Sequence, residues 1–187
     1  RNKSCGRSDA RMNPSGELLL AKDPEKGFRL LMARYKEAVY WHIRRIVVSH
    51  ADAQDATQET FVRVFRSFYQ FKGECAFTSW IYRIATNEAL RFLSRYRDGR
   101  VSLDNANEEI NEMMADDYVD YSDLETVKLQ KAILALPTKQ QLAFNLRYYN
   151  ELGYDEIAEI LGSTPDNVKS NYHIAKEKII KYMHLNN

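Results

Sequence analysis

The sequence predicts an all-α protein made of two small helical domains joined by an acidic linker. Three observations lead to this prediction. Apolar residues recur at steps of three and four, which is the spacing of one face of a helix. Acidic residues gather in a middle segment that separates two basic parts. The 187 residues, of which 44% are hydrophobic, allow one ordinary domain or two small ones.

The net charge of +1 conceals three unlike parts of the chain. Residues 24–97 carry thirteen basic and seven acidic side chains, residues 98–126 carry one and ten, and residues 127–187 carry eight and six. We therefore place the domains at 24–97 and 124–187, with an acidic linker at 98–123. Such a linker is either a soluble connector or a negatively charged segment that keeps two basic domains apart or occupies them as nucleic acid would.

Several protein classes are excluded by the sequence. No apolar run approaches the roughly 20 residues that a membrane-spanning helix needs. Cys5 and Cys75 lie far apart without CxxC partners, so we expect neither a disulfide framework nor structural zinc, and we place the protein in the cytoplasm. No phosphate loop, metal-ligand spacing or nucleophile arrangement points to an enzyme or a cofactor. Residues 1–23 are expected to be a flexible lead-in.

The first domain is expected to contain three helices. They begin near Phe28, after the polar break at residues 49–52, and near Thr78, and they run to about residues 47, 71 and 97. In each of them one apolar stripe recurs at helical spacing and indicates the buried face. The second helix is expected to bury Phe61, Val64, Phe65 and Phe68.

The second domain is expected to contain four helices, of which the last two form a helix-turn-helix. The first two run from about 123 to 135 and from 138 to 150, separated by Pro137. Residues 154–161 form a short helix that Gly162 ends, and Thr164 caps a final helix that begins at Pro165. The turn between them is tight enough for a helix-turn-helix.

The final helix carries two different faces. One apolar stripe is expected to pack on Ile157 and Leu161; it consists of Val168, Tyr172, Ala175 and Ile179. The opposite stripe contains donors that suit entry into a major groove, because lysine and small polar side chains near a helix N-terminus bind bases and phosphates. The alternative is a helical hairpin with an ordinary solvated face. The charge of this domain is small, so we expect it to bind DNA together with a partner.

The third helix of the first domain offers a different surface. Trp80 provides a flat ring beside Arg83, Asn87 and Arg91, and an aromatic ring with neighbouring cations suits unpaired bases. Alternatively, Trp80 covers the domain core and the arginines are ordinary surface charges. The sequence alone leaves both interpretations open.

Two motifs resemble the sigma factors of bacterial RNA polymerase, in particular the short extracytoplasmic-function (ECF) group. Residues 52–65, DAQDATQETFVRVF, resemble the polymerase-binding helix, and residues 71–87, FKGECAFTSWIYRIATN, resemble the promoter-melting segment. In the second domain, residues 134–137, 154–158 and 168–175 are similar to the reader of the upstream promoter element. The resemblance implies that the two domains are sigma regions 2 and 4, without the third domain of larger sigma factors.

The resemblance also implies roles for individual residues and partners. Asp55, Gln58 and Glu59 would dock on the beta-prime coiled-coil of core RNA polymerase, whose beta flap is a second contact. The −10 element and its melted strand would be bound by Lys72, Trp80, Arg83, Asn87 and Arg91. The −35 element would be read by Lys169, Ser170, Asn171, His173 and Lys176. Further implied partners are promoter DNA and an anti-sigma factor.

The predicted function is therefore a promoter-specificity subunit that binds core polymerase, recognises the −35 and −10 elements and melts DNA without catalysis. The alternative is a helix-turn-helix regulator that does not bind polymerase as a sigma subunit. An anti-sigma antagonist is less consistent with the sequence, since it needs neither the Trp80 surface nor a helix that reads the groove.

Overall fold

The computed structural model describes residues 22–47, 49–71, 76–97 and 124–185, and the regular structure in these ranges is entirely helical. The elements are α2 (Pro24–Val47), α3 (His50–Ser67), the short 3-10 helix η1 (Phe68–Gln70), α4 (Phe77–Arg97), α6 (Leu124–Leu134), α7 (Thr138–Tyr148), α8 (Tyr154–Leu161) and α9 (Pro165–Leu185). The all-α prediction is confirmed. The expected lead-in up to residue 21, the linker at 98–123 and Lys72 lie outside the described residues.

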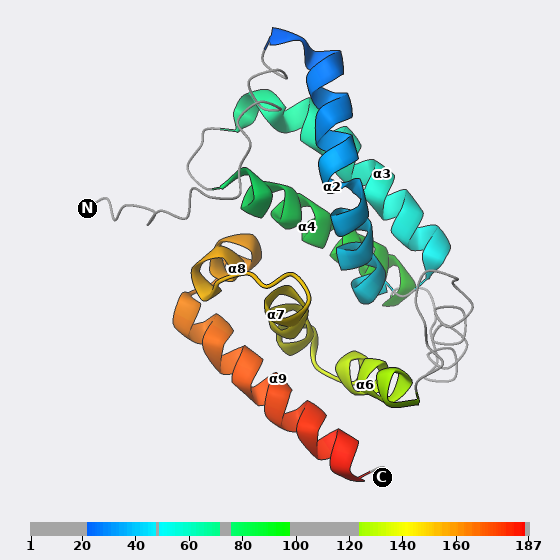
Figure 1. Ribbon diagram of the computed structural model, residues 1–187, viewed down its shortest axis with the longest axis vertical. Helices are drawn as coiled ribbons and strands as arrows, with labels where there is room; N and C mark the ends of the chain where they lie inside the picture. The colour runs from blue at the N-terminus through cyan, green and yellow to red at the C-terminus, as the bar shows by residue number, and fades with distance from the viewer. Residues whose placement is uncertain (1–21, 48, 72–75, 98–123, 186–187) are drawn as a thin grey trace.

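The first three long helices form one bundle, in which α2, α3 and α4 each pack against the other two (Figure 1). Val39 and Ile43 of α2, Phe61 of α3, and Ile81 and Ala85 of α4 are buried together in its core. The helices pack because each presents a continuous apolar stripe to the others. Ser49 accepts a hydrogen bond from the backbone N–H of Asp52 and so begins α3.

One predicted core residue of this bundle is wrong. Phe65 is 44% exposed, whereas Phe61 and Val64 are buried as expected and Phe68 is partly buried. On a helix, positions 61, 64 and 68 lie on one stripe, and position 65 lies beside it. Phe65 therefore sits at the edge of the core, where its ring meets that of Phe28 at 5.1 Å.

The second group of helices contains the predicted helix-turn-helix, formed by α8 and α9. Gly162 ends α8 in the left-handed conformation, with φ of 61°, which glycine adopts without steric cost. Thr164 accepts a hydrogen bond from the backbone N–H of Asn167 (3.3 Å), and Pro165 is the first residue of α9. The predicted ends of both helices are confirmed.

The packing of α9 differs in part from the sequence expectation. Val168 packs with Ile157 of α8 as predicted. Ala175 and Ile179, further along the helix, instead pack against α6 and α7, where they meet Ile133 and Phe144. The reason is length, because α8 has eight residues and covers only the first part of the 21-residue α9.

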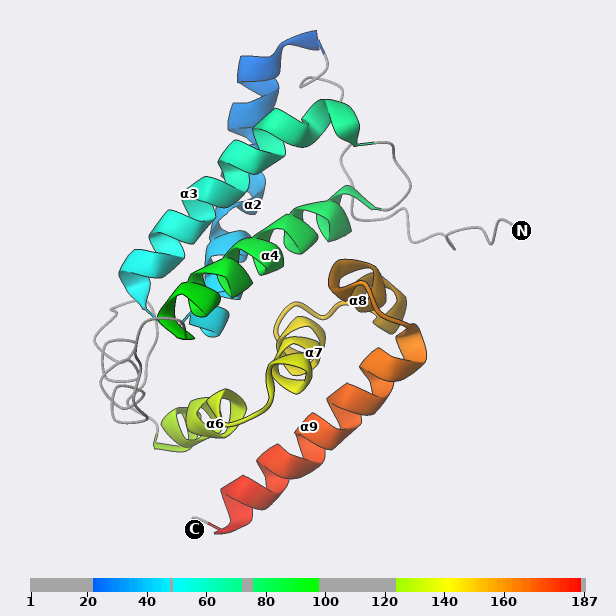
Figure 2. The same cartoon turned by 180° about the vertical axis from the view of Figure 1, so that it is seen from behind.

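The two groups of helices are in direct contact. Helix α4 lies between α2 and α3 on one side and α8 on the other, and α2 also contacts α7. Figures 1 and 2 show α7 and α8 below α4 from opposite sides of the molecule, with α9 along the outer edge. No described helix combines the length and apolar character needed to cross a membrane.

Candidate functional site

The outward face of α9 carries four of the five predicted groove-reading residues. Lys169, Ser170, His173 and Lys176 are all exposed. The Ser170 hydroxyl donates to the backbone carbonyl of Asp166 (2.9 Å), which leaves its lone pairs facing solvent. These side chains cover the first half of the helix, the part that a helix-turn-helix inserts into the major groove.

Asn171, the fifth residue, lies in a different environment. It is partly buried, and its side-chain amide donates to the backbone carbonyl of Asn167 one turn earlier (2.9 Å). Both asparagines line a cavity of about 530 Å³ between the two domains. Asn87 of α4, a predicted −10 residue, lines the same cavity, together with Leu90. The structure thus brings one residue of each predicted DNA surface to a shared space.

Trp80 is neither fully buried nor fully free. Its ring centroid lies 5.4 Å from that of Phe77 and 5.1 Å from that of Phe71, so one part of the ring rests on the edge of the domain core. Phe77 itself is completely buried. This contact restricts the rotamers of Trp80 while part of the ring remains accessible, which is the state a stacking platform needs.

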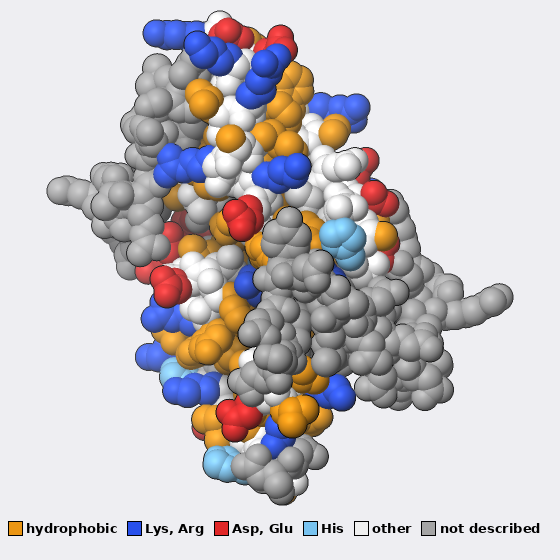
Figure 3. Space-filling view, turned by 45° about the vertical axis from the view of Figure 1, so that its right-hand side comes forward, with side chains coloured by type: hydrophobic (Ala, Val, Ile, Leu, Met, Phe, Trp, Pro, Cys, Tyr) orange, Lys and Arg blue, Asp and Glu red, His pale blue; other side chains and the backbone are white. Residues whose placement is uncertain are grey.

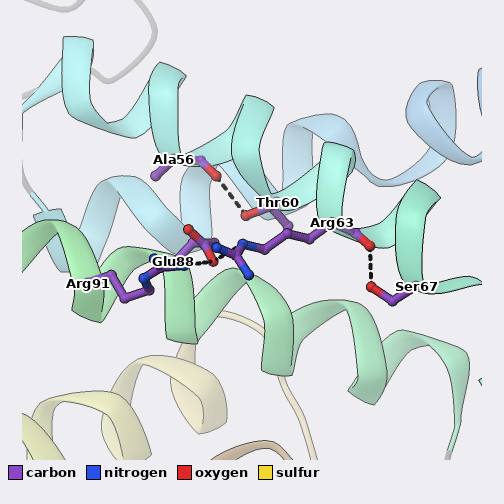
Figure 4. A network of polar contacts seen from close by, with 6 residues as sticks. All are labelled: Ala56, Thr60, Arg63, Ser67, Glu88 and Arg91. Atoms are coloured by element: carbon purple, nitrogen blue, oxygen red, sulfur yellow. Dashed lines mark hydrogen bonds and ion pairs between the residues drawn. The ribbon is translucent and has the colours of Figure 1, made fainter. Parts of the chain in front are cut away.

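The two arginines of the predicted melting surface differ in their contacts. Arg83 is exposed, whereas Arg91 forms an ion pair with Glu88 (3.2 Å). Figure 4 shows Glu88 between Arg91 of the same helix and Arg63 of α3, with both guanidinium groups directed at one carboxylate oxygen. The side chain of Glu88 is only 6% exposed. Helices α3 and α4 are therefore joined by a buried carboxylate with two cationic partners.

The predicted polymerase-binding residues lie beside this ion-pair group. Asp55, Gln58 and Glu59 are exposed on α3, as predicted. They line a cavity of about 360 Å³ together with Arg63, Glu88 and Arg91. The predicted docking surface on α3 and the start of the predicted melting surface on α4 are therefore adjacent.

The basic side chains on one face of the molecule are dispersed. Figure 3 shows Lys and Arg in separate places on the visible face, interspersed with hydrophobic and acidic side chains. The part of this face that the structure describes therefore offers no large continuous basic patch to a nucleic acid. In the described ranges, no cluster of His, Cys, Asp and Glu is arranged to hold a metal ion.

Two residues of these surfaces were not singled out from the sequence. Glu88 follows Ile81 and Ala85 on the buried stripe of α4, so the helical period already placed a carboxylate on an apolar face, where it needs a cationic partner. Asn167 is exposed in the first turn of α9. Its position in the N-terminal turn of a recognition helix was the available signal.

Comparison with known proteins decides the family. Residues 31–98 match the family described as sigma-70 region 2, and residues 126–179 match the family described as sigma-70, region 4. The chain belongs to the sigma-70 family. We call α2, α3 and α4 region 2 of this sigma factor, and α6 to α9 its region 4.

Relatives place this sigma factor in the ECF group. The ECF RNA polymerase sigma-E factor of Haemophilus influenzae is 30% identical over 164 residues, which cover 83% of this chain and 86% of the relative. The sigma-E factor of Escherichia coli strain K12 is 32% identical over 167 residues, with coverages of 84% and 87%. The resemblance seen in the sequence is confirmed, and the sigma role is favoured over a regulator that does not bind polymerase. The sigma factor family is not a class of enzymes.

Solved structures support the same fold. CnrH, in complex with the cytosolic domain of CnrY, matches with a TM-score of 0.71 at 20% identity, over 92% of this sigma factor and 97% of CnrH. The sigma factor RpoE from Bartonella quintana, in complex with the anti-sigma factor NepR, matches with a TM-score of 0.65 at 19% identity, over 87% and 99%. These matches extend over both regions.

Proposed function

We propose that this sigma factor binds core RNA polymerase and directs it to promoters through two DNA surfaces, one on each region. The observation that supports this best is the exposed polar face of α9, which belongs to a correctly capped helix-turn-helix. Lys169, His173 and Lys176 on this face would read the −35 element, with Ser170 and Asn171 beside them. Bases are contacted by side chains and phosphates by the helix N-terminus.

Docking on polymerase is assigned to the exposed face of α3. Asp55, Gln58 and Glu59 would contact the beta-prime coiled-coil, while region 4 would contact the beta flap. The side chains of Asp55 and Glu59 are exposed. Neither takes part in the ion pairs described above, so those pairs do not compete with a basic partner for their carboxylates. Charged residues at the edge of an interface mainly set the association rate and the choice of partner.

Promoter melting is assigned to α4. Trp80, anchored on Phe77, would stack on an unpaired base of the −10 element, and Arg83 would neutralise the nearby backbone. Asn87, Arg91 and Lys72 complete the proposed surface. Melting of this kind captures bases that have already left the duplex, so it needs binding energy rather than a chemical step. We therefore propose that the protein is not itself an enzyme.

Regulation and location follow from the same role. We propose that an anti-sigma factor controls this chain. The solved structures of CnrH and RpoE each contain a second protein, and the protein bound to RpoE, NepR, is named an anti-sigma factor. A polymerase subunit acts where the polymerase is, so we place the protein in the cytoplasm.

The test is run-off transcription with core polymerase and a pool of random promoter sequences. We expect transcripts that depend on this chain and share two sequence elements. The double variant Lys169→Ala/His173→Ala should bind core polymerase normally but lose selection of the upstream element. Absence of transcripts, together with no binding to core polymerase, would contradict the proposal.

A further inference from the structure

The outward face of α9 contains an apolar side chain among its polar groups. Val168, Ala175 and Ile179 form the buried stripe of the helix and are at most 6% exposed, whereas Ile174 is 42% exposed. Ile174 takes no part in the three apolar cores found among the described residues. A single exposed isoleucine is common on protein surfaces, so its position decides whether it has a role.

The position of Ile174 distinguishes it from an ordinary surface residue. Asp166, Ser170 and Ile174 follow one another at steps of four residues, so their side chains lie in one row along α9. All three are exposed. At a rise of about 1.5 Å per residue the row is about 12 Å long, which is similar to the width of the major groove. A recognition helix that lies in the groove therefore brings the whole row to the base edges.

The two polar members of this row act as hydrogen-bond acceptors. The Ser170 hydroxyl donates its only proton to the backbone carbonyl of Asp166 (2.9 Å), so it offers lone pairs to a ligand. The side chain of Asp166 is a carboxylate, which only accepts when it is ionised. The donors Lys169 and Lys176 lie to one side of the row. The row itself thus presents two acceptors and one alkyl group.

The asparagines on the other side of the row are engaged within the protein. The side-chain amide of Asn171 donates to the backbone carbonyl of Asn167 (2.9 Å), and that of Asn167 donates to the hydroxyl oxygen of Ser163 (3.2 Å). Asn171 is also partly buried. Neither amide is therefore in the free state that two simultaneous hydrogen bonds to an adenine require. Ile174 is the more accessible of the groups that can distinguish one base from another here.

The shape of isoleucine suits a contact of fixed geometry. A β-branched side chain on a helix has one strongly preferred χ1 rotamer, so the methyl groups of Ile174 are in place before DNA binds. A helical side chain also leans toward the N-terminus, and Ile174 therefore covers the surface beside Ser170. This surface belongs to the half of α9 that enters the groove. Little rotamer entropy is lost when such a side chain is buried against a base.

The major-groove edges of the bases differ in how well they match this row. The apolar group on these edges is the C5-methyl group of thymine, and its partner adenine presents an amino group that Ser170 or Asp166 can accept. Cytosine also presents an amino group but lacks the methyl group. Guanine presents the acceptors N7 and O6, which find no partner opposite acceptors and an alkyl group. An A·T pair therefore fits the row better than a G·C pair.

We propose that Ile174 is a specificity-determining residue that selects thymine at one position of the −35 element through contact with the C5-methyl group. This inference rests on the proposed function, because it takes α9 to be the reader of that element. Lys169 and Lys176 bind phosphate oxygens or guanine beside this contact. Burial of one methyl group contributes about a four-fold factor in affinity, which is the size of the expected preference.

The test compares two bases that differ only in this methyl group. Holoenzyme assembled from core polymerase and the full chain first selects its upstream element from a promoter pool that is randomised at the −35 positions. Each thymine of the selected element is then replaced in turn by uracil, which lacks the C5-methyl group. The dissociation constants of the thymine and uracil promoters are measured with the same holoenzyme. We expect uracil at one position to weaken binding about four-fold.

Three variants assign this preference to a residue. Ile174→Ala should bind the thymine and uracil promoters equally at that position, while Ile174→Val keeps a branched methyl group and should retain most of the preference. Ile180→Ala is the matched control, because Ile180 is 46% exposed on the same helix but lies beyond the row, and it should keep the full preference. We expect all three to fold, since these side chains are largely outside the core and alanine is the better helix former.

The possible failures of this inference and of the proposed function are distinguishable. A selected element in which no uracil weakens binding overturns the inference and leaves the proposed function intact. The same holds if Ile174→Ala still distinguishes thymine from uracil as the unaltered chain does, or if Ile180→Ala loses the preference equally. Holoenzyme that selects no upstream element counts against the proposed function itself, and the inference is then rejected with it.

Discussion

The guanidinium group of Arg45 lies 4.1 Å from the ring centroid of Tyr149 and so joins the last turn of α2 to the residues after α7. The tyrosine is also held at its hydroxyl, which accepts a hydrogen bond from the side-chain amide of Gln130 on α6 (2.9 Å). The ring therefore presents a fixed face to the cation. A guanidinium over such a face contributes up to about 2 kcal/mol where water is excluded.

The energetic coupling between Arg45 and Tyr149 can be measured in a double-mutant cycle. We expect Arg45→Ala and Tyr149→Leu to lower the free energy of unfolding less in combination than the sum of their separate effects, with a coupling of about 1 kcal/mol. Urea unfolding followed by circular dichroism gives the four values. Additive effects would show that the two groups do not interact.

The ion-pair group of Glu88 predicts an unusually large effect for a polar substitution. Glu88→Gln leaves Arg63 and Arg91 side by side without their shared anion, in a position where the carboxylate is almost completely buried. We expect a loss of about 2 kcal/mol in the free energy of unfolding, less than for a fully buried pair because both arginines are about half exposed. Glu25→Gln is the matched control: Glu25 pairs with Arg29 in solvent, and its removal should cost nearly nothing. Equal losses of unfolding free energy in Glu88→Gln and Glu25→Gln would show that the buried ion-pair group of Glu88 does not stabilise the fold.

A pH dependence follows from His42. Burial, together with the positive charge of Arg45, lowers the pKa of His42 from 6.5 to about 3. Between about pH 6.5 and pH 3, His42 is protonated in the unfolded chain but neutral in the folded chain. The free energy of unfolding therefore falls as the pH falls through this window. Between pH 6.5 and 5, the unaltered chain should lose about 1.5 kcal/mol more than His42→Gln. If the free energy of unfolding changed with pH in the same way for both proteins, His42 would not be neutral in the folded chain.

The sequence was sufficient for the existence of the long helices and for the ends that meet at the helix-turn-helix, whereas α2 begins four residues before the expected Phe28 and α3 ends at Ser67, before the expected Phe71. Periodicity identified the buried faces, and Pro137, Gly162 and Thr164 marked the boundaries by backbone chemistry that depends on few neighbours. The exposed α3 and α9 faces were predicted for the same reason. Amphipathic spacing predicts which face of a helix is exposed to solvent, and this relation holds in most folds.

Sequence reasoning was weaker on what each buried face packs against. Tyr82 and Leu142 lie on apolar faces, but no local pattern distinguishes packing within a domain from packing against another domain. Phe65 was misplaced because a helix face has no sharp border, and the neighbour Phe28 decides how much of the ring is covered. The interface between regions depends on contacts between residues distant in sequence, which short-range patterns do not contain.

Reversal of charge on α3 separates a docking role from simple solubility. Asp55→Lys places a cation on the proposed polymerase-binding face, and we expect at least a ten-fold loss of affinity for core polymerase in a pull-down or fluorescence titration. The same change at Glu25→Lys, exposed in the first turn of α2 and outside the cavities that the docking residues line, should have little effect. Full binding by Asp55→Lys would leave this face with no role beyond solubility.

Trp80 gives the sharpest test of melting, because one ring both contacts the core and offers a surface. Trp80→Ala removes stacking worth about 1 to 3 kcal/mol per base, so permanganate reactivity of thymines in the −10 element should fall about five-fold or more. Trp80→Phe keeps an aromatic face and contact with Phe77, and should restore part of the reactivity. Thermal unfolding of both variants, and their affinity for core polymerase, report any general damage to region 2. Reactivity equal to that of the unaltered chain in Trp80→Ala would mean that the ring only covers the core, and that unpaired bases are held by other residues of α4.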